Sequence, residues 1–269
     1  MGRSTIGEIV LETCEALNTV LKGFIKIPTS ADEWRSTALH FGKKWNFFHC
    51  LGSIDGKHVA IRKPANSGSM YYNYKMAVVN SNYEFIMVDV GSNGRVSDGG
   101  VMFYTSFWQR FLNGQLNLPP PQPLPGIQSE TPYVFIADDA FPLSTNLVPV
   151  HTRVNFIKKF HEIRPYSSTN LTKEQQIFNY RLSRARRVVE NTFGVLAARF
   201  GDFQKPMLLE PKKAAIVTLT CCYLHNFLIK HNKKEYASRS VMEYENVATG
   251  NIQRGQNFKN SHLMSLQTA

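Results

Sequence analysis

The sequence predicts an α/β fold in which a sheet is flanked by helices and preceded by a short helical region. Short apolar stretches with strand-like character are concentrated between residues 51 and 137. Helical apolar periodicity lies on both sides of them, over 4–23 and most clearly over 173–200. Hydrophobic residues make up 43% of the 269-residue chain and charged residues 19%, which is typical of a globular protein with a substantial core.

The first predicted helix covers residues 4–23. Ser4 or Thr5, followed by Glu8, resembles a capping box, in which a hydroxyl and a carboxylate satisfy free N–H groups of the first turn. Apolar residues then recur at helical spacing: Ile6, Ile9, Val10, Cys14, Leu17, Val20 and Leu21.

A second helix is predicted over residues 30–43, with Ser30 as its N-cap and Glu33 three residues later. Two helices alone bury little surface. We therefore expect this N-terminal helical region, residues 1–50, to pack against the rest of the chain.

The middle of the chain is predicted to form strands. Residues 51–61 form one apolar stretch, and 76–79 and 85–90 are separated by Asn-Ser-Asn-Tyr, which is typical of a hairpin. Residues 133–137 are continuously apolar, as expected of a short buried strand. Between these strands, a helix is predicted over 99–112. Residues 117–132 contain six prolines and are expected to form a loop.

Two further helices complete the prediction. The longer covers residues 173–200, and the last covers about 212–231, where His225 is expected to be a core residue. The second domain would therefore span residues 51–232, and residues 233–269 are expected to be a disordered tail because they are polar and lack a pattern.

The positive charge is concentrated at one end of the chain. The net charge is +11, and residues 151–269 carry 19 Lys and Arg against 8 Asp and Glu. A one-sided basic segment suits a polyanion such as DNA, because each phosphate contact releases counterions. A solvated basic surface without such a partner is the alternative interpretation.

Cysteine spacing and hydropathy exclude several classes of protein. The four cysteines form no CxxC pair, and two are adjacent in an apolar run, so buried free thiols in a reducing compartment are expected and a zinc site is not. No signal peptide and no apolar run of roughly 18 residues is present, so we expect a soluble intracellular protein without a membrane segment.

Three acids fall at positions where an acid is costly unless something neutralises it. Asp55 lies within a strand-like run, Asp138 ends another, and Glu190 lies beside the apolar stripe of the long helix. Carboxylate oxygens are suitable ligands for Mg²⁺ or Mn²⁺. Two such ions roughly 3.5–4 Å apart can activate water and stabilise a leaving oxygen in phosphodiester cleavage.

Each acid also has an ordinary explanation. Asp55 is close in sequence to Lys57 and could pair with it. Glu190 follows Arg186 by four residues and Arg187 by three, which is the spacing of an exposed helical salt bridge. Composition and spacing alone do not choose between these interpretations.

The sequence around the acids resembles the Harbinger-type DDE transposases and the nucleases derived from them. The resemblance covers about residues 2–230, and its ordered motifs are highly specific as a set. They are Gly52-Ser-Ile-Asp-Gly-Lys-His-Val59, Tyr71-Tyr-Asn-Tyr-Lys75, Val88-Asp-Val-Gly91, Gly94-Arg-Val-Ser-Asp-Gly-Gly100, Ala137-Asp-Asp-Ala-Phe-Pro-Leu143, Phe178 to Gly194, and Leu224-His-Asn-Phe-Leu228.

The resemblance implies an α/β RNase H-like fold, a mixed sheet flanked by helices, with a DDE triad at Asp55, Asp138 and Glu190. These residues would hold the divalent cation, Mg²⁺ or Mn²⁺, with two ions per site. The implied activity is a metal-dependent DNA endonuclease. Asp139 is the rival for the second position, and in a short strand it points to the opposite face from Asp138.

The resemblance also bears on partners. Four arginines share the helix of Glu190, and some of them are expected to contact the DNA backbone, although a solvated helix face is the alternative. They are Arg181, Arg184, Arg186 and Arg187. A separate Myb-like DNA-binding protein often serves such nucleases, and we expect a nuclear location, or a cytoplasmic one without an import partner. The competing function is a catalytically inactive, DNA-associated or regulatory protein.

The chain departs from the family pattern in three places. Residues 1–50 resemble the end of a helix-turn-helix-like region whose earlier helices are missing. Lys75 runs almost directly into Met76-Ala77, so an apolar segment is missing, and we expect the strand beside that of Asp55 to be cut short. Residues 148–163 resemble an insertion.

Overall fold

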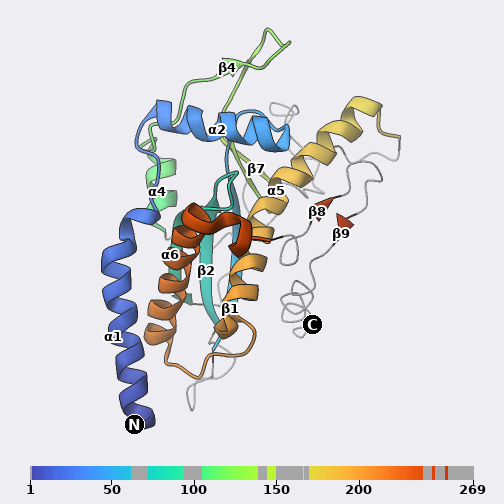
Figure 1. Ribbon diagram of the computed structural model, residues 1–269. Helices are drawn as coiled ribbons and strands as arrows, with labels where there is room; N and C mark the ends of the chain where they lie inside the picture. The colour runs from blue at the N-terminus through green and yellow to red at the C-terminus, as the bar shows by residue number, and fades with distance from the viewer. Residues whose placement is uncertain are drawn as a thin grey trace.

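A computed structural model of the chain contains a central five-stranded sheet (Figure 1). It describes residues 2–61, 72–93, 105–138, 144–149, 166, 170–238, 244–245 and 252–253. The strand order is β3-β2-β1-β6-β7. The strand bounds are Cys50–Ala60 for β1, Tyr72–Val79 for β2, Phe85–Asn93 for β3, Val134–Ala137 for β6 and Leu147–Pro149 for β7.

The sheet is mixed, with β1 at its centre. β1 pairs with β2, and β2 with β3, in antiparallel fashion. On its other side β1 pairs with β6 in parallel, and β6 pairs with β7 in parallel. This order confirms the predicted α/β, RNase H-like mixed sheet. It also confirms the predicted hairpin, although β2 and β3 are both longer than expected.

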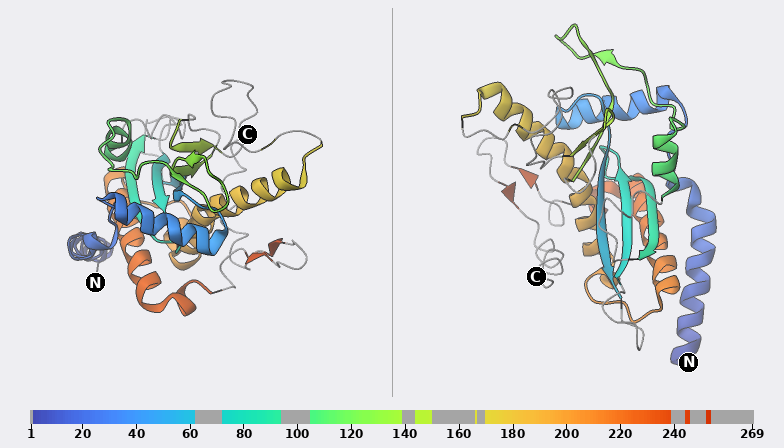
Figure 2. Two further views of the ribbon diagram at one scale, coloured as in Figure 1. Left: turned by 90° about the horizontal axis from the view of Figure 1, so that it is seen from above. Right: turned by 180° about the vertical axis from the view of Figure 1, so that it is seen from behind.

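Helices cover the two faces of this sheet (Figures 1 and 2). α5 (Lys173–Arg199) and α6 (Pro211–Tyr236) pack on one face, which we call the α5 face. Its core includes Ala77, Val79, Ile136, Val189 and Phe193. On the other face, α2 (Ala31–Trp45) and α4 (Ser106–Leu112) contribute to a second core cluster. That cluster includes Trp34, Ile54, Met76, Phe107 and Phe135. The alternation of β1 and β6 residues between two cores explains why these strands read as apolar stretches.

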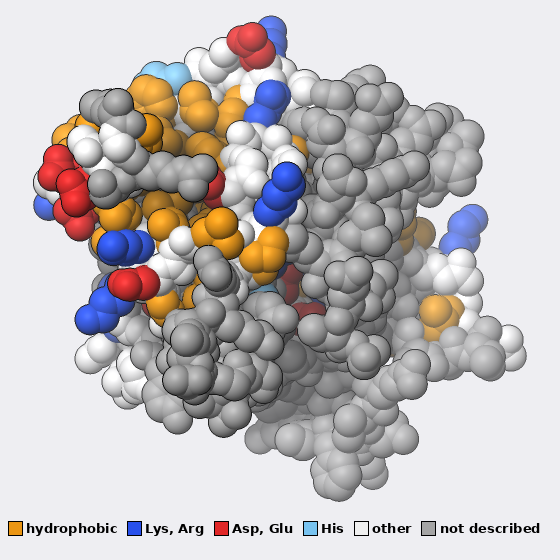
Figure 3. All heavy atoms as spheres, turned by 90° about the horizontal axis from the view of Figure 1, so that it is seen from below, with side chains coloured by type: hydrophobic (Ala, Val, Ile, Leu, Met, Phe, Trp, Pro, Cys, Tyr) orange, Lys and Arg blue, Asp and Glu red, His pale blue; other side chains and the backbone are white. Residues whose placement is uncertain are grey.

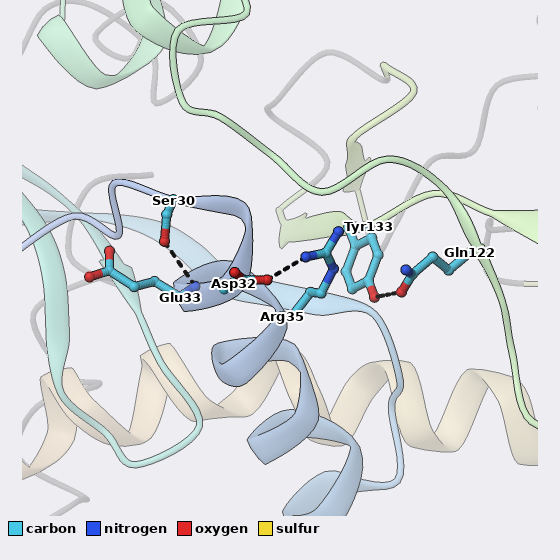
Figure 4. Close-up of polar contacts among 6 residues, drawn as sticks. All are labelled: Ser30, Asp32, Glu33, Arg35, Gln122 and Tyr133. Atoms are coloured by element: carbon cyan, nitrogen blue, oxygen red, sulfur yellow. Dashed lines mark hydrogen bonds and ion pairs between the residues drawn. The ribbon is translucent and has the colours of Figure 1, made fainter.

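The two N-terminal helices differ in how closely they follow the sequence prediction. α2 begins as predicted, because the Ser30 hydroxyl accepts a hydrogen bond from the N–H of Glu33 at 3.2 Å (Figure 4). α1 (Arg3–Leu21) has the predicted extent, but its N-cap is Gly2 and no side chain caps it, so the predicted capping box is wrong. α1 lies beside α6, and the Thr220 hydroxyl donates to Asn18 Oδ1 at 2.9 Å. The N-terminal region therefore packs on the rest of the chain, as expected.

Several element boundaries differ from those predicted. The predicted loop 117–132 contains two paired two-residue strands, β4 (Gln122–Pro123) and β5 (Glu130–Thr131). The hydroxyl of Tyr133 donates to Gln122 Oε1 at 2.7 Å, which fixes this pair to the start of β6 (Figure 4). α4 begins at Ser106, capped by the Thr105 side chain, and residues 99–104 of the predicted helix lie outside the described part of the chain.

The last helix continues past the predicted end, so the segment expected to be a disordered tail from residue 233 begins with helix. Arg199 Nε donates to the carbonyl of Tyr236 at 2.7 Å, and the buried Tyr236 ring packs against His225. These tertiary contacts stabilise a turn that the local sequence does not favour. Two further two-residue strands, β8 (Tyr244–Glu245) and β9 (Ile252–Gln253), pair with each other.

The strand next to Asp55 is not cut short, contrary to the expectation drawn from the missing segment. β2 pairs with all of β1 from Ser53 to Ala60, and Asp55 lies opposite Ala77. The residues of the Tyr72–Lys75 motif themselves occupy the strand, which brings Lys75 into the sheet opposite Lys57. Of the apparent insertion at 148–163, residues 148 and 149 belong to β7, and the remainder lies outside the described residues.

No helix in the described part of the chain is both long and apolar enough to span a bilayer. The four cysteines are free, and Cys50, Cys221 and Cys222 are buried, as expected.

Candidate active site

Asp55 lies on β1, and Asp138 directly follows the end of the neighbouring parallel strand β6. The register pairs Ser53 of β1 with Ile136 of β6, so two residues further along each strand Asp55 and Asp138 reach the same level. Ile54 and Ala137, the residues before them, belong to the opposite core. Because side chains alternate between faces, both aspartates point to the α5 face.

Glu190 reaches the same place from α5. This helix is fixed against β1 by the Ser53 hydroxyl, which donates to the carbonyl of Arg186 at 3.0 Å. Val188 and Val189 are fully buried, so Glu190, which follows them, lies where the helix meets the sheet. The structure thus brings together the three acids that the sequence singled out. The space-filling view from below shows a few acidic side chains recessed near the middle of this side of the molecule (Figure 3).

Arg186 lies between two of these acids. Its Nη2 atom is 3.3 Å from Asp138 Oδ2 and 3.3 Å from Glu190 Oε1. The ion pair between Arg186 and Glu190 that their spacing on the helix allowed is therefore present. It is mostly buried rather than exposed. The Arg186 side chain is 17% exposed, Asp138 26% and Glu190 30%. A guanidinium that bridges two carboxylates neutralises charge that would otherwise destabilise this part of the core.

Asp55 is the acid most affected by its surroundings. The pKa of its carboxyl is raised to about 7, first by burial and then by the nearby carboxylates of Glu190 and Asp138, while Arg186 opposes them. The N–H of Gly56 donates to Asp55 Oδ1 at 2.9 Å and also lowers this pKa. A strongly perturbed acid within the electrostatic influence of two others is typical of a functional site, although structural ion networks produce the same signature.

The donor set fits a divalent cation in its chemistry. All three groups offer hard carboxylate oxygens of the kind that Mg²⁺ and Mn²⁺ bind. The Arg186 guanidinium is itself a cation held between two of them. Within the described ranges, however, no group of three His, Cys, Asp or Glu residues is arranged to hold a metal ion.

The other predicted site residues have different surroundings. Arg181 is exposed on α5. Arg184 lies over the rings of Trp45 and Tyr180, with its guanidinium carbon 5.6 Å from each centroid. Arg187 is half-buried. Asp139, the rival for the second acid position, lies outside the described residues, so only Asp138 is placed.

His225 is a core residue, as predicted. It is fully buried, its Nε2 lies 2.7 Å from the carbonyl of Tyr83, and its Nδ1 lies 3.0 Å from the hydroxyl of Tyr236. Burial lowers the pKa of its imidazole to about 4, so it is neutral at pH 7.

Sequence reasoning missed a group of lysines beside the acids. Lys57, Lys75 and Lys205 line one small pocket together with Phe193 and Phe203. Strand alternation puts Lys57 on the same face as Asp55, which could have indicated its position. Nothing in the sequence indicated that Lys75 would be buried, because its place in β2 depends on the register with β1.

Fold and site together define an RNase H-like protein with two strand aspartates and a helix glutamate on one face of the sheet. The family model described as DDE superfamily endonuclease matches residues 54–226, which include all three acids. The chain belongs to this family.

A human relative supports this assignment. The human protein named "Putative nuclease HARBI1" is 24% identical over 251 residues, which cover 88% of this chain and 62% of the relative. The chain thus spans less than two thirds of that relative's length. No solved structure shows a significant match.

Proposed function

We propose that the protein is a metal-dependent DNA endonuclease of transposase origin whose reaction centre is formed by Asp55, Asp138 and Glu190. The observation that supports this most strongly is the meeting of three acids, from β1, β6 and α5, on one face of the sheet in a chain of the DDE endonuclease family. Mg²⁺ or Mn²⁺, with two ions per site, would supply the activation of water and the stabilisation of the leaving oxygen.

The protein's own contribution is to hold the acids rigidly. Asp55 and Asp138 are fixed by the register of β1 and β6. Glu190 is fixed by the packing of α5. Phe193, which follows about one turn later on this helix, is buried. Ligands on regular elements with buried neighbours lose little freedom when a cation binds. Arg186 has to release Asp138 and Glu190 before their oxygens become available.

A second function is favoured by one observation. Because Arg186 already bridges Asp138 and Glu190, the same geometry suits a protein that keeps the fold and binds DNA without cutting it. Its DNA contacts would come from the basic C-terminal part of the chain, residues 151–269, which contains 19 Lys and Arg but only 8 Asp and Glu.

Nicking of supercoiled DNA in the presence of Mn²⁺ tests the first proposal. We expect Asp55→Asn, Asp138→Asn and Glu190→Gln each to reduce the nicking rate by roughly 10³-fold or more, because the acids act as one unit. Asp89→Asn is the matched control. Asp89 is a half-buried acid whose pKa burial also raises, but it lies opposite Met76, on the other face of the sheet.

Each outcome separates the alternatives. Nicking that persists in all three variants would come from a contaminant and would contradict the proposal. A wild-type protein that does not nick, but binds DNA with a steep dependence on salt, would support the non-catalytic function.

A nuclear location and a Myb-like partner stay predictions, and co-purification with a tagged chain from nuclear extract would test both.

A further inference from the structure

The lysine pocket lies directly beside the acids on the same face of the sheet. Lys57 is two residues beyond Asp55 on β1, about 7 Å along the strand. Lys75 on β2 is its cross-strand partner. The third lysine, Lys205, is in the segment that follows α5. The N–H of Met207 donates to the carbonyl of Ala60 at 2.9 Å, which ties this segment to the end of β1.

Lys75 is an unusual residue for the interior of a sheet. It is 3% exposed, and its Nζ atom lies 4.7 Å from the ring centroid of Phe193 and 4.3 Å from that of Phe203. Two cation–π contacts hold the ammonium between the rings, but they do not replace an anion. Two lysines directly opposite each other on neighbouring strands also repel.

Among the described residues, no acid forms an ion pair with these three lysines, Lys57, Lys75 and Lys205. The polar groups near Lys75 include the thiols of Cys221 and Cys222. Burial raises the pKa of both thiols, that of Cys222 to about 11, so neither is charged at neutral pH. The acids nearest Lys57 are Asp55 and Glu190, which belong to the reaction centre.

We propose that this pocket, lined by Lys57, Lys75 and Lys205, binds a phosphate of the DNA backbone next to the phosphate that meets the acids. Three lysines that line one small pocket with aromatic walls match the negative charge of a phosphodiester group. The pocket is within one nucleotide's reach of Asp55, so a phosphate held here fixes the position of the strand relative to the acids. The proposal rests on DNA being the substrate, and it does not require that the DNA is cut.

DNA binding measured without divalent metal tests the pocket independently of catalysis. Fluorescence anisotropy with a labelled duplex gives the dissociation constant at several salt concentrations. We expect Lys75→Met to weaken binding about tenfold and to reduce the slope of log K against log salt by about 0.9, the value for one phosphate contact. Lys205→Glu, at the exposed rim, should act in the same direction and leaves the buried residues unchanged.

The matched control is Lys230→Met. Lys230 is an exposed lysine on α6 that also lies over an aromatic ring, 5.7 Å from the centroid of Phe24. It lines a different pocket from that of the three lysines. We expect this variant to retain the wild-type slope. Thermal unfolding of each variant shows whether it is folded. Folded Lys75→Met and Lys205→Glu proteins with wild-type affinity and slope would overturn the proposal.

A second measurement identifies the source of the phosphate. A series of duplexes is used in which one uncharged methylphosphonate linkage is moved along the strand. At one position this linkage should weaken binding to the wild type but should not weaken binding to Lys75→Met. If inorganic phosphate stabilises the wild type but not Lys75→Met, and the DNA slopes are equal, the pocket binds free phosphate and the proposal is wrong. If the wild type does not nick DNA but the lysine-dependent slope is present, the pocket stands and the nuclease proposal fails.

Discussion

Two charged clusters lie next to each other on the α5 face, and they are neutralised in different ways. The acidic cluster of Asp55, Asp138 and Glu190 contains its own counter-ion, because Arg186 lies 3.3 Å from two of the three carboxylates. The lysine cluster, which begins two residues further along β1 at Lys57, has no acid of its own among the described residues. The acidic cluster can therefore exist without a ligand, whereas the lysine cluster gains most from an external anion.

This difference indicates that the two clusters respond differently to ligands. A divalent cation, if it binds here as proposed, would have to compete with the Arg186 guanidinium for Asp138 and Glu190. A phosphate at the lysine cluster would not have to displace an ion-paired acid of the described residues. Charge that is uncompensated inside a protein lowers its stability in the free state and is retained where binding restores the balance. Three substitutions test this comparison.

Arg186→Met should have the largest effect, because it removes the internal cation from the acidic cluster. We expect a loss of about 3 kcal/mol in the free energy of unfolding without metal, since two mostly buried carboxylates lose the cation that bridges them. Mn²⁺ should then stabilise the variant more than the wild type. Urea unfolding with and without Mn²⁺ measures both effects. Arg181→Met, at an exposed position on the same helix, should change stability by less than about 0.5 kcal/mol. An equal response of Arg186→Met and the wild type to Mn²⁺ would show that the guanidinium does not compete with metal.

Asp55→Asn should stabilise the metal-free protein at neutral and alkaline pH. The pKa of Asp55 is raised from 3.8 to about 7 in the folded state, so the folded protein binds the proton more tightly than the unfolded chain. Stability is therefore lost as pH rises from about 4 to 7 and is constant above that. Discounted for partial exposure, the variant should gain about 2 kcal/mol at pH 8 and nothing at pH 4. Unfolding curves across this range check the prediction. A gain of the same size at both pH values would mean that charge is not the cause.

Lys75→Met should have the smallest effect on stability, a gain of about 1 kcal/mol at pH 7. Burial lowers the pKa of Lys75 from 10.5 to about 8, so the charged amine is destabilising in the folded state, but the substitution also removes two cation–π contacts. Because the folded pKa is depressed, the wild type gains stability relative to the variant as pH rises from 8 to 10.5. The difference between the two proteins should therefore shrink in this range. Denaturant unfolding at pH 7 and pH 10 measures it. If the variant is less stable than the wild type at pH 7, the aromatic contacts outweigh the cost of burying the charge.

The fold was largely predictable because its main elements have strong periodic patterns. The stripe from Phe178 to Phe200 predicted α5 almost to the residue, and the apolar run before Asp138 predicted β6. Ser30 and Glu33 located the start of α2. The capping box at the start of α1 was wrong, because a Ser or Thr followed by Glu occurs also where the chain is already helical.

Elements that depend on distant contacts were predicted less well. The extension of α6 to Tyr236 depends on Arg199, which is 37 residues away. The pairing of β4 with β5 occurs within a proline-rich loop whose local sequence disfavours strands. The full length of β2 depends on its register with β1, which overrode the expectation that the missing segment would shorten the strand.

For the site, the sequence by itself determined which acids stand out and on which elements they lie. Motifs of a few residues around Asp55, Asp138 and Glu190 carry that information locally, and so does strand alternation. Only the tertiary structure decided what surrounds them: that Arg186 lies between Asp138 and Glu190, and that Lys75 is buried opposite Lys57. The physical reason is that charge neutralisation and burial depend on groups far apart in the chain, which come within reach of each other only when the sheet and α5 pack together.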